Sequence, residues 1–375
     1  MMSLEALTEI SRYYGKNPDY VLAGGGNTSW KDEDTLYVKG SGISLAEAGP
    51  DSFVKMDRNA LAMIWKKNYP ESNDERESAV LADLMDARRA GEEKKRPSVE
   101  TLLHDILPFA FVVHLHPALV NGLTCSQRGE KTAEEIFGKD AIWIAPVNPG
   151  YTLSKIVKTA IDEYKSKNGK AAAVIFLQNH GVFVGDNSPE GIKKIYEDIM
   201  NKIRARIKRR PDFSDEKIVH DDSQIEPQIS DNIKTLAGLA GSTVFMRGGE
   251  ISALVKDRAS FAPVSSAFSP DHIVYAGSDP LFIETNTSAG IHDAWTQYVE
   301  KTRRKPKIVA LQGLGVFGVG ASEKAALLAL ELFRDTIKVA VYSQSFGGPL
   351  FMTQDKIDFI NNWEVERYRA NVSAK

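Results

Sequence analysis

The sequence predicts a mixed α/β protein in which one domain is followed by a diverged second copy of itself. Amphipathic helical patterns alternate with short apolar runs of strand length along most of the chain. The run at residues 175–185 recurs at 309–319, with Leu, Gln, Gly, Val and Phe at matching offsets, which indicates a tandem duplication. A charged segment with two prolines lies between the two runs, as expected of a linker.

The composition is that of a globular protein that acts on small molecules. The 375 residues are 42% apolar and 26% charged, and this length allows two domains with cores of their own. A net charge of -3 provides no global positive field for nucleic acid or for an acidic membrane surface. A single cysteine, Cys125, and the lack of a leader or a long apolar span favour a cytoplasmic protein.

Helices and strands alternate through the first half of the chain. Residues 4–14 carry apolar residues at helical spacing behind a Ser3 N-cap, and the same spacing predicts helices at 74–90, 153–164 and 188–207. Short strands are expected at 21–23 and 36–39, each opening a loop of small residues, and buried strands at 109–113 and 171–177. Backbone N–H groups of the two loops would form an anion nest with nearby polar side chains, namely Asn27, Thr28, Ser29 and Ser41.

The charged segment at 211–228 is predicted to link a first domain, residues 1–210, to a second, residues 229–375. Beyond the linker we expect strands at 244–246 and 251–255, with helices at 233–240 and, last in the chain, at 357–368. The repeated run places Leu314 where the first copy has His180. The strand equivalent to 109–113 is expected near 272–277, without a pair of histidines.

Two histidines stand two residues apart at the end of the strand predicted at 109–113. Side chains alternate along a strand, so His114 and His116 point to one face and can bind one metal ion. His180 ends another apolar strand, just before Gly181. Three histidines at two strand ends leave a coordination position open, which suits catalytic rather than structural zinc. A bare His-x-His pair is more often simply polar, so the wider context decides.

Glu100, upstream of the histidine strand, has two interpretations. It is either a charge at a helix start or a general base beside the metal. Carbon-acid chemistry needs a carboxylate to move the proton and a cation to hold the resulting oxyanion. No lysine stands in a context that suggests a Schiff base, so the metal would be the electron sink.

Five short motifs occur in a fixed order: GGGNTS at 24–29, KGSG at 39–42, PSVET at 97–101, HLHP at 114–117 and NHG at 179–181. In this order they resemble the class II aldolase/adducin family, and most closely its rhamnulose-1-phosphate aldolase-like branch. The resemblance covers nearly the whole chain. In that branch the aldolase part is often fused to a C-terminal short-chain dehydrogenase, which we do not expect in this chain.

The resemblance implies a three-layer α/β/α domain with a mostly antiparallel mixed sheet and an active site at a subunit boundary. The protein would then be a homo-oligomer, a dimer or a tetramer. His114, His116 and His180 would bind a divalent cation, usually Zn2+, with Mn2+ or Co2+ as alternatives, and Glu100 would be the acid/base. Residues of three motifs would bind the substrate phosphate: Asn27, Thr28, Ser41, Gly42 and Ser98.

The expected function is that of a metal-dependent aldolase, a carbon–carbon lyase of carbohydrate metabolism. It would cleave a ketose phosphate through a metal-stabilised enediolate. Two departures from the family pattern matter. Val99 stands where many members have a second serine. Val147 stands where family aldolases have a tyrosine that donates a proton to the neighbouring subunit's site, and Tyr151 is displaced from it.

Three alternatives compete with the aldolase. A sugar-phosphate 4-epimerase or a dehydratase would use the same site, and the sequence does not separate them. An adducin-like binding module is disfavoured by the intact histidines and Glu100. A dehydrogenase is suggested by the G-x-G-x-x-G pattern at 313–318, but the segment between these glycines is strand-like, whereas a dinucleotide fingerprint enters a helix.

The second copy, without ligands, would replace a neighbouring subunit within one chain.

Overall fold

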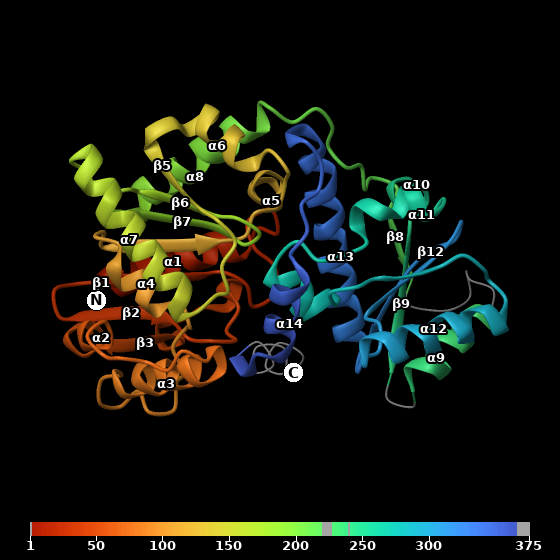
Figure 1. Cartoon of the computed structure of the whole chain (residues 1–375), viewed down its shortest axis with the longest axis horizontal. Coiled ribbons are helices and arrows are strands. Elements are labelled where there is room, and N and C mark those ends of the chain that lie inside the picture. Colours follow the sequence, from red (N-terminus) through yellow and green to blue (C-terminus); the bar gives the residue numbers. More distant parts are fainter. Residues whose placement is uncertain (1, 220–226, 239–240, 366–375) are drawn as a thin grey trace. The chain divides into compact units, whose positions relative to one another are not determined.

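The structure, a computed structural model, describes residues 2–219, 227–238 and 241–365 (Figure 1). The described residues form two compact units. The first contains 2–124, 128–206 and 362–365, and the second contains 125–127, 207–219, 227–238 and 241–361. The predicted α/β class is confirmed, because both units combine a sheet with helices. The linker expected at 211–228 stays a prediction, and its residues 220–226 lie outside the described part.

The first unit is built on a mixed seven-stranded sheet with the order β3-β2-β1-β4-β7-β6-β5. Neighbouring strands are antiparallel except β5 and β6, which are parallel, so the predicted mostly antiparallel sheet is confirmed. The strands are β1 Asn27–Lys31, β2 Thr35–Lys39, β3 Phe53–Asp57, β4 Phe111–Leu115, β5 Ala141–Ile144, β6 Val174–Leu177 and β7 Gly181–Asp186.

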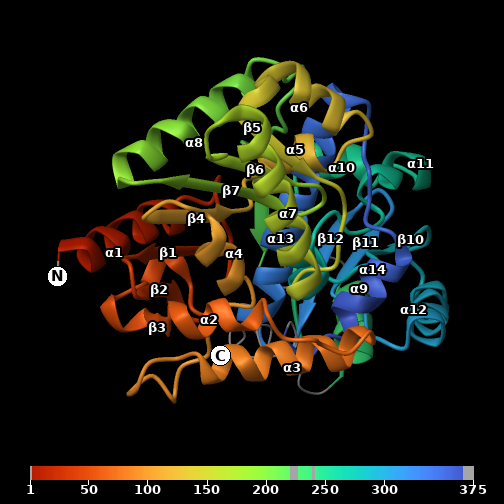
Figure 2. The ribbon, with the colours of Figure 1, turned by 60° about the vertical axis from the view of Figure 1, so that its left-hand side comes forward.

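Helices cover both faces of this sheet, which gives three layers (Figure 2). One face contacts α1 Met2–Gly15, α5 Ala118–Thr124, α6 Gly129–Phe137 and α8 Pro189–Arg204. The other face contacts α2 Arg58–Ile64, α4 Thr101–Ile106 and α7 Tyr151–Asn168, and α3 Asn73–Asp86 packs against α2 and α7. Within the described chain, no helix combines the length and apolar character that crossing a membrane would require.

The core of the first unit explains why α4 is held tightly against the sheet. Leu103 and Leu107 are buried against Val112 of β4, and the same cluster includes apolar residues of α7 and β6: Leu153, Val157, Ile161, Ile175 and Leu177. Burying such side chains contributes about 1.5–3 kcal/mol each before the entropy cost of ordering them. The segment from Glu100 to His104 is thus fixed next to β1 and β4.

The second unit contains, among the described residues, a five-stranded sheet with the order β10-β11-β12-β9-β8. Its strands are β8 Lys217–Val219, β9 Ser242–Arg247, β10 Leu281–Ile283, β11 Ile308–Leu311 and β12 Gly315–Gly320. Its helices are α9 Pro227–Ala237, α10 Gly249–Leu254, α11 Arg258–Phe261, the π-helical turn η6 His272–Ala276, α12 Ser288–Thr302 and α13 Glu323–Ser343. The short helix α14 Gln354–Asn362 follows.

The order β10-β11-β12-β9-β8 repeats β5-β6-β7-β4-β1 of the first sheet. In both sheets the first pair is parallel and the remaining pairs are antiparallel. In both, one helix connects the two parallel strands and a long helix follows the hairpin. This shared topology is what a diverged second copy of the domain predicts.

Three predicted strands are wrong. Residues 21–23 form a turn with Ala23 at φ 52°, and the strand begins only at Asn27. Residues 251–255 lie in or next to α10, where Ile251 and Val255 are buried four residues apart, which is a helical spacing. Residues 272–276 form η6, because an apolar run that is buried on all sides fits a helix as well as a strand.

Candidate metal centre

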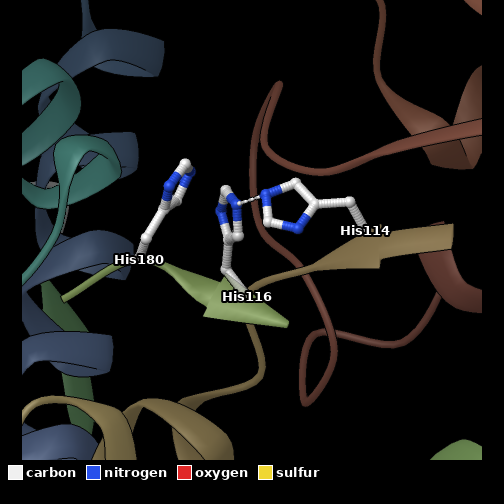
Figure 3. A group of neighbouring side chains, drawn as sticks. All are labelled: His114, His116 and His180. Atoms are coloured by element: carbon white, nitrogen blue, oxygen red, sulfur yellow. Dashed lines mark hydrogen bonds between the residues drawn. The ribbon is translucent and has the colours of Figure 1, made fainter. Parts of the chain in front are cut away.

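Three imidazoles converge where β4 ends and β7 begins. His114 is the fourth residue of β4, His116 follows that strand, and His180 lies in the hairpin turn before β7. Their potential ligand atoms all lie within 4.8 Å of one another. Nε2 of His114 is 2.9 Å from Nε2 of His116 (Figure 3). The structure therefore brings His180 together with His114 and His116, the pair that strand alternation places on one face.

Glycines permit this close approach. A Cβ on Gly181 would lie 2.4 Å from the carbonyl oxygen of Leu115 and 2.6 Å from Cδ2 of His116. Gly26 has φ +63°, and a Cβ there would lie 2.8 Å from the carbonyl oxygen of His114. Asn179, in the hairpin turn, adopts the left-handed conformation at φ 57°, which asparagine tolerates better than most residues. These backbone features let the segments that carry the three histidines lie close together.

The tautomer of His114 follows from its surroundings. Nδ1 lies 3.1 Å from the carbonyl oxygen of Val182, which only accepts, so Nδ1 carries the hydrogen and Nε2 keeps its lone pair. The hydroxyl of Tyr196 in α8 donates to the same carbonyl at 3.3 Å and to that of Val113 at 3.0 Å. Metal-binding histidines commonly donate their second ring nitrogen to a carbonyl in this way.

The carboxylate of Glu100 lies beside the histidine cluster. Oε1 is 3.4 Å from Nε2 of His114 and 3.7 Å from Nε2 of His180. Oε2 accepts a hydrogen bond of 2.6 Å from Nδ2 of Asn27. Oε1 is buried and has no hydrogen-bond partner among the described residues. Glu100 precedes α4 but its side chain makes no capping bond, so the geometry favours the second interpretation of this residue.

The cluster fits a divalent transition metal. Three imidazole nitrogens within 4.8 Å of one another, with a carboxylate oxygen nearby, form a donor set typical of catalytic zinc and also suited to cobalt or manganese. The orphaned Oε1 of Glu100 is consistent with a cation or a reacting group in front of it, because a buried carboxylate oxygen without a partner is costly. Among the described residues, this is the cluster of potential metal ligands that the structure presents.

Two of the predicted phosphate-binding residues lie next to Glu100. Oγ of Ser98 accepts from Nδ2 of Asn27 and from the backbone N–H of Glu100, both at 3.2 Å, so its own hydrogen is used by neither bond. Residues 40–42 run alongside this segment, since Gly40 pairs with Pro97 and the N–H of Ser41 donates to Arg96 at 2.8 Å. Gly42 follows with φ +83°.

The prediction that the side chain of Thr28 binds the substrate phosphate is wrong. Thr28 was expected to face the phosphate, but its side chain lies on the opposite face of β1 from Asn27, because neighbouring residues of a strand alternate. It is fully buried, and its hydroxyl is hydrogen-bonded to that of Ser11 in α1 at 2.7 Å. Thr28 therefore ties the sheet to the other helical layer and contributes no side chain to the site.

Tyr151 is built into the core of the first unit. It begins α7, where its backbone N–H donates to Glu77 at 3.0 Å. Its ring lies 5.8 Å from that of Trp65 and 4.9 Å from that of Tyr69, and burial raises the pKa of its hydroxyl. Val147 packs against the same unit's core. The proton donor stays unassigned.

His104 is a residue of the site that the sequence analysis did not identify. Its imidazole is fully buried, with Nδ1 2.7 Å from Oγ of Ser29 and Nε2 in contact with Oδ1 of Asn27. The available signal was its spacing, because His104 follows Glu100 by four residues, and one interpretation of Glu100 places it at a helix start. Residues four apart lie on one helix face.

The second unit has lost the histidine cluster. Gly181 and Gly315 are equivalent, because each is the first residue of the second strand of its hairpin. With these two residues superposed, the strand registers align β4 with β9. The positions of His114, His116 and His180 are occupied by Phe245, Arg247 and Leu314. Phe245 is buried in an apolar cluster against which Leu314 packs. The loss of ligands was expected, but the equivalent strand is β9 rather than residues 272–277.

Comparison with known proteins identifies the class. Residues 5–204, more than half of the chain, match the class II aldolase and adducin N-terminal domain, so the protein belongs to this family. A curated relative, the uncharacterized oxidoreductase YuxG of Bacillus subtilis, is 24% identical over 99% of this chain, which spans 58% of that protein's length.

Two solved structures each resemble about half of the chain. One is the N-terminal class II aldolase domain of a conserved protein from Thermoplasma acidophilum, with 26% identity, a TM-score of 0.45, and coverage of 54% of this chain and 92% of that one. The other is an L-fuculose 1-phosphate aldolase, with 19% identity, a TM-score of 0.37, and coverage of 53% and 84%.

Proposed function

We propose that this protein is a metal-dependent aldolase that cleaves a carbon–carbon bond of a ketose phosphate. The observation that carries the proposal is the buried, unpartnered Oε1 of Glu100, 3.4 Å from the ring nitrogen that His114 presents to the cluster. A divalent cation held by His114, His116 and His180 would supply Lewis-acid stabilisation of the enediolate that cleavage leaves. Family membership supports an enzyme of this class.

The residues around the cluster would transfer the proton and bind the substrate phosphate. Glu100 transfers the proton at Oε1, while Asn27 holds Oε2 by a hydrogen bond and keeps the carboxylate in place. The hydroxyl of Ser98 and the loop at Ser41 and Gly42 bind the substrate phosphate, which accepts hydrogen bonds from hydroxyl and backbone N–H groups. The substrate class follows from this phosphate site, and the rhamnulose-1-phosphate aldolase-like branch is our proposal for the nearest enzymes.

The dehydrogenase alternative has less support in this chain. The glycines of the pattern at 313–318 lie in the turn before β12 and in β12 itself, whereas a dinucleotide fingerprint turns directly into a helix. The name of the Bacillus relative belongs to a protein of which this chain spans 58%. A 4-epimerase or a dehydratase would use the same cluster, so the product distinguishes these reactions from the cleavage that we propose.

The test is a lyase assay on a panel of ketose 1-phosphates with Zn2+, Mn2+ or Co2+ added to the protein. We expect release of dihydroxyacetone phosphate from at least one substrate. Glu100→Gln should lower kcat by about a hundredfold to ten-thousandfold, since the amide keeps the shape but does not take up a proton. Its metal content should stay that of the wild type. An E100Q variant with full lyase activity, or a product that keeps the intact carbon chain, would contradict the proposal.

A further inference from the structure

We propose that His104 is a positioning residue that orients the side-chain amide of Asn27 and, through it, the carboxylate of Glu100. The chemical role of Glu100 rests on the proposed function, but the orientation itself does not. Three hydrogen bonds connect the groups in sequence, from Ser29 to His104, from His104 to Asn27 and from Asn27 to Glu100.

Two periodicities bring these four residues together. Asn27 and Ser29 are two apart in β1 and lie on the face that α4 covers. Glu100 and His104 are four apart at the start of α4 and share one face of that helix. All four side chains are at least nine-tenths buried. Buried polar side chains cost free energy unless each has a hydrogen-bond partner. The donor and the acceptor of each hydrogen bond in this series can therefore be assigned.

The carboxylate determines the direction of the hydrogen bonds. Oε2 of Glu100 only accepts, so Asn27 must turn its NH2 group toward Glu100 and its oxygen toward His104. That oxygen also only accepts, so Nε2 of His104 carries a hydrogen. In a neutral ring Nδ1 is then an acceptor, and it receives the hydroxyl hydrogen of Ser29 at 2.7 Å.

The surroundings of the ring favour this neutral form. Burial, together with the positive charges of Lys31 and Lys39, lowers the pKa of His104 well below its ordinary value. Nζ of Lys31 donates to the backbone carbonyl of His104, and Phe183 packs edge-on against the imidazole, 5.5 Å between centroids. The ring is therefore held in one orientation and one tautomer.

The consequence concerns the amide of Asn27, which is nearly symmetric in shape. Rotated by half a turn, it would place Oδ1 against the carboxylate of Glu100, and two acceptors would face each other. The N–H of His104 excludes this state because it would then meet the NH2 group. Oε2 of Glu100 is held by this arrangement, so Oε1 stays directed toward His114 and His180.

A matched pair of variants isolates the critical hydrogen. In His104→Gln the side-chain NH2 takes the place of the imidazole Nε2–H, whereas in His104→Asn the amide reaches only as far as Nδ1. H104Q should therefore keep the bond to Asn27, and H104N should lose it. Both substitutions remove the imidazole, so an effect of losing the ring alone would be the same in the two variants.

The first measurement uses the protein without added metal and needs no activity. In wild-type protein labelled with 15N-histidine, the ring of His104, assigned by its absence from H104Q, should show the Nε2–H tautomer. In protein labelled with 15N-asparagine, the side-chain amide resonance of Asn27 should move on Glu100→Gln. This response should persist in an H104Q background and disappear in an H104N background.

The second measurement is kinetic. H104N should lower kcat by about tenfold to a hundredfold, while KM and bound metal stay near wild-type values, and H104Q should restore most of the loss. An Nδ1–H tautomer for His104, or an equal response of Asn27 in both backgrounds, would overturn the proposal. If H104N does not fold, the wild-type tautomer and H104Q still decide. Absence of lyase activity with the expected NMR result would reject the proposed function and leave the positioning role intact.

Discussion

The imidazole of His114 stacks on the phenyl ring of Phe183, with 4.0 Å between centroids and 13° between the ring planes. The register equivalents in the second unit, Phe245 and Phe317, also form a pair, at 4.7 Å and 47°. The two units thus share an aromatic pair between neighbouring strands, and only the first has an imidazole in it. His114 therefore occupies a position that the second unit fills with an ordinary aromatic core residue, so the fold does not require a metal-binding side chain there.

The first prediction concerns metal binding. His180→Leu copies the residue that the second unit has at this turn, so the fold should persist while one of three imidazoles is lost. We expect bound zinc, measured by elemental analysis after dialysis, to fall to a small fraction of the wild-type stoichiometry. His292→Leu, which changes an exposed histidine of the second unit, serves as the matched control. Equal zinc in wild type and H180L would remove the basis of the proposed centre.

The second prediction concerns the backbone beneath the histidines. Gly181→Ala places a methyl group 2.4 Å from the carbonyl oxygen of Leu115 and 2.6 Å from the ring of His116. We expect a loss of about 1–3 kcal/mol in the free energy of unfolding, measured in urea, and weaker zinc binding. Gly49→Ala is the control, because a Cβ there meets nothing within 4 Å. Equal unfolding curves for the two variants would show that the hairpin adjusts without cost.

The sequence predicted the mixed α/β fold, and the family resemblance implied the mostly antiparallel mixed sheet and the convergence of the three histidines. The sequence did not locate β1, because Asn27, Thr28 and Ser29 are polar yet buried, and a hydrophobic pattern does not reveal such a strand. This same feature misplaced Thr28. Its direction depends on where β1 begins, and a shift of one residue moves a side chain to the other face.

His104 was missed for a related reason. Its role depends on Ser29 and Asn27, which become its neighbours only once β1 is placed against α4. In the second copy, the strand registers agree with the predicted repeat of the hairpin, but the strand predicted near 272–277 is not the equivalent of β4. An all-apolar run does not distinguish a strand from a buried helical turn, and only the sheet register identifies β9.

The third prediction is a pH dependence of stability that comes from Lys31. Burial lowers the pKa of its buried ammonium group from 10.5 to about 7. Between these values the unfolded chain holds a proton that the folded protein does not, so this residue makes stability rise with pH from about 7 to 10.5. Below about pH 7 Lys31 is charged in the folded protein as well, so the free-energy cost of burying its ammonium group reaches its maximum.

Lys31→Met should therefore stabilise the protein more at pH 6 than at pH 10, as measured by urea unfolding at both values. Lys167→Met, at a lysine whose side chain is 75% exposed, should change stability equally at the two values. If Lys31→Met leaves the slope of stability against pH unchanged, the buried amine does not titrate in this window.

The last prediction concerns assembly. Tyr151 is packed in the core of its unit and Val147 has no ionisable group, so the family's proton donor has no counterpart at these two positions. The family resemblance implies an active site at a subunit boundary, so we still propose that the active protein is a homo-oligomer, with the proton donor unassigned. Light scattering coupled to chromatography should give the mass of a dimer or a tetramer. A monomer with full lyase activity would show that one chain is sufficient.

The hydroxyl of Tyr196 reaches from α8 to the carbonyl of Val182 that fixes the ring of His114. Counted from the serine caps Ser188 and Ser322, its equivalent in α13 is Leu330. The second unit has thus exchanged the tyrosine as well as the imidazoles. To transfer this centre to another scaffold of the same topology, a designer would need to transfer the tyrosine of the following helix along with the three histidines. The strands that carry the histidines would not be sufficient by themselves.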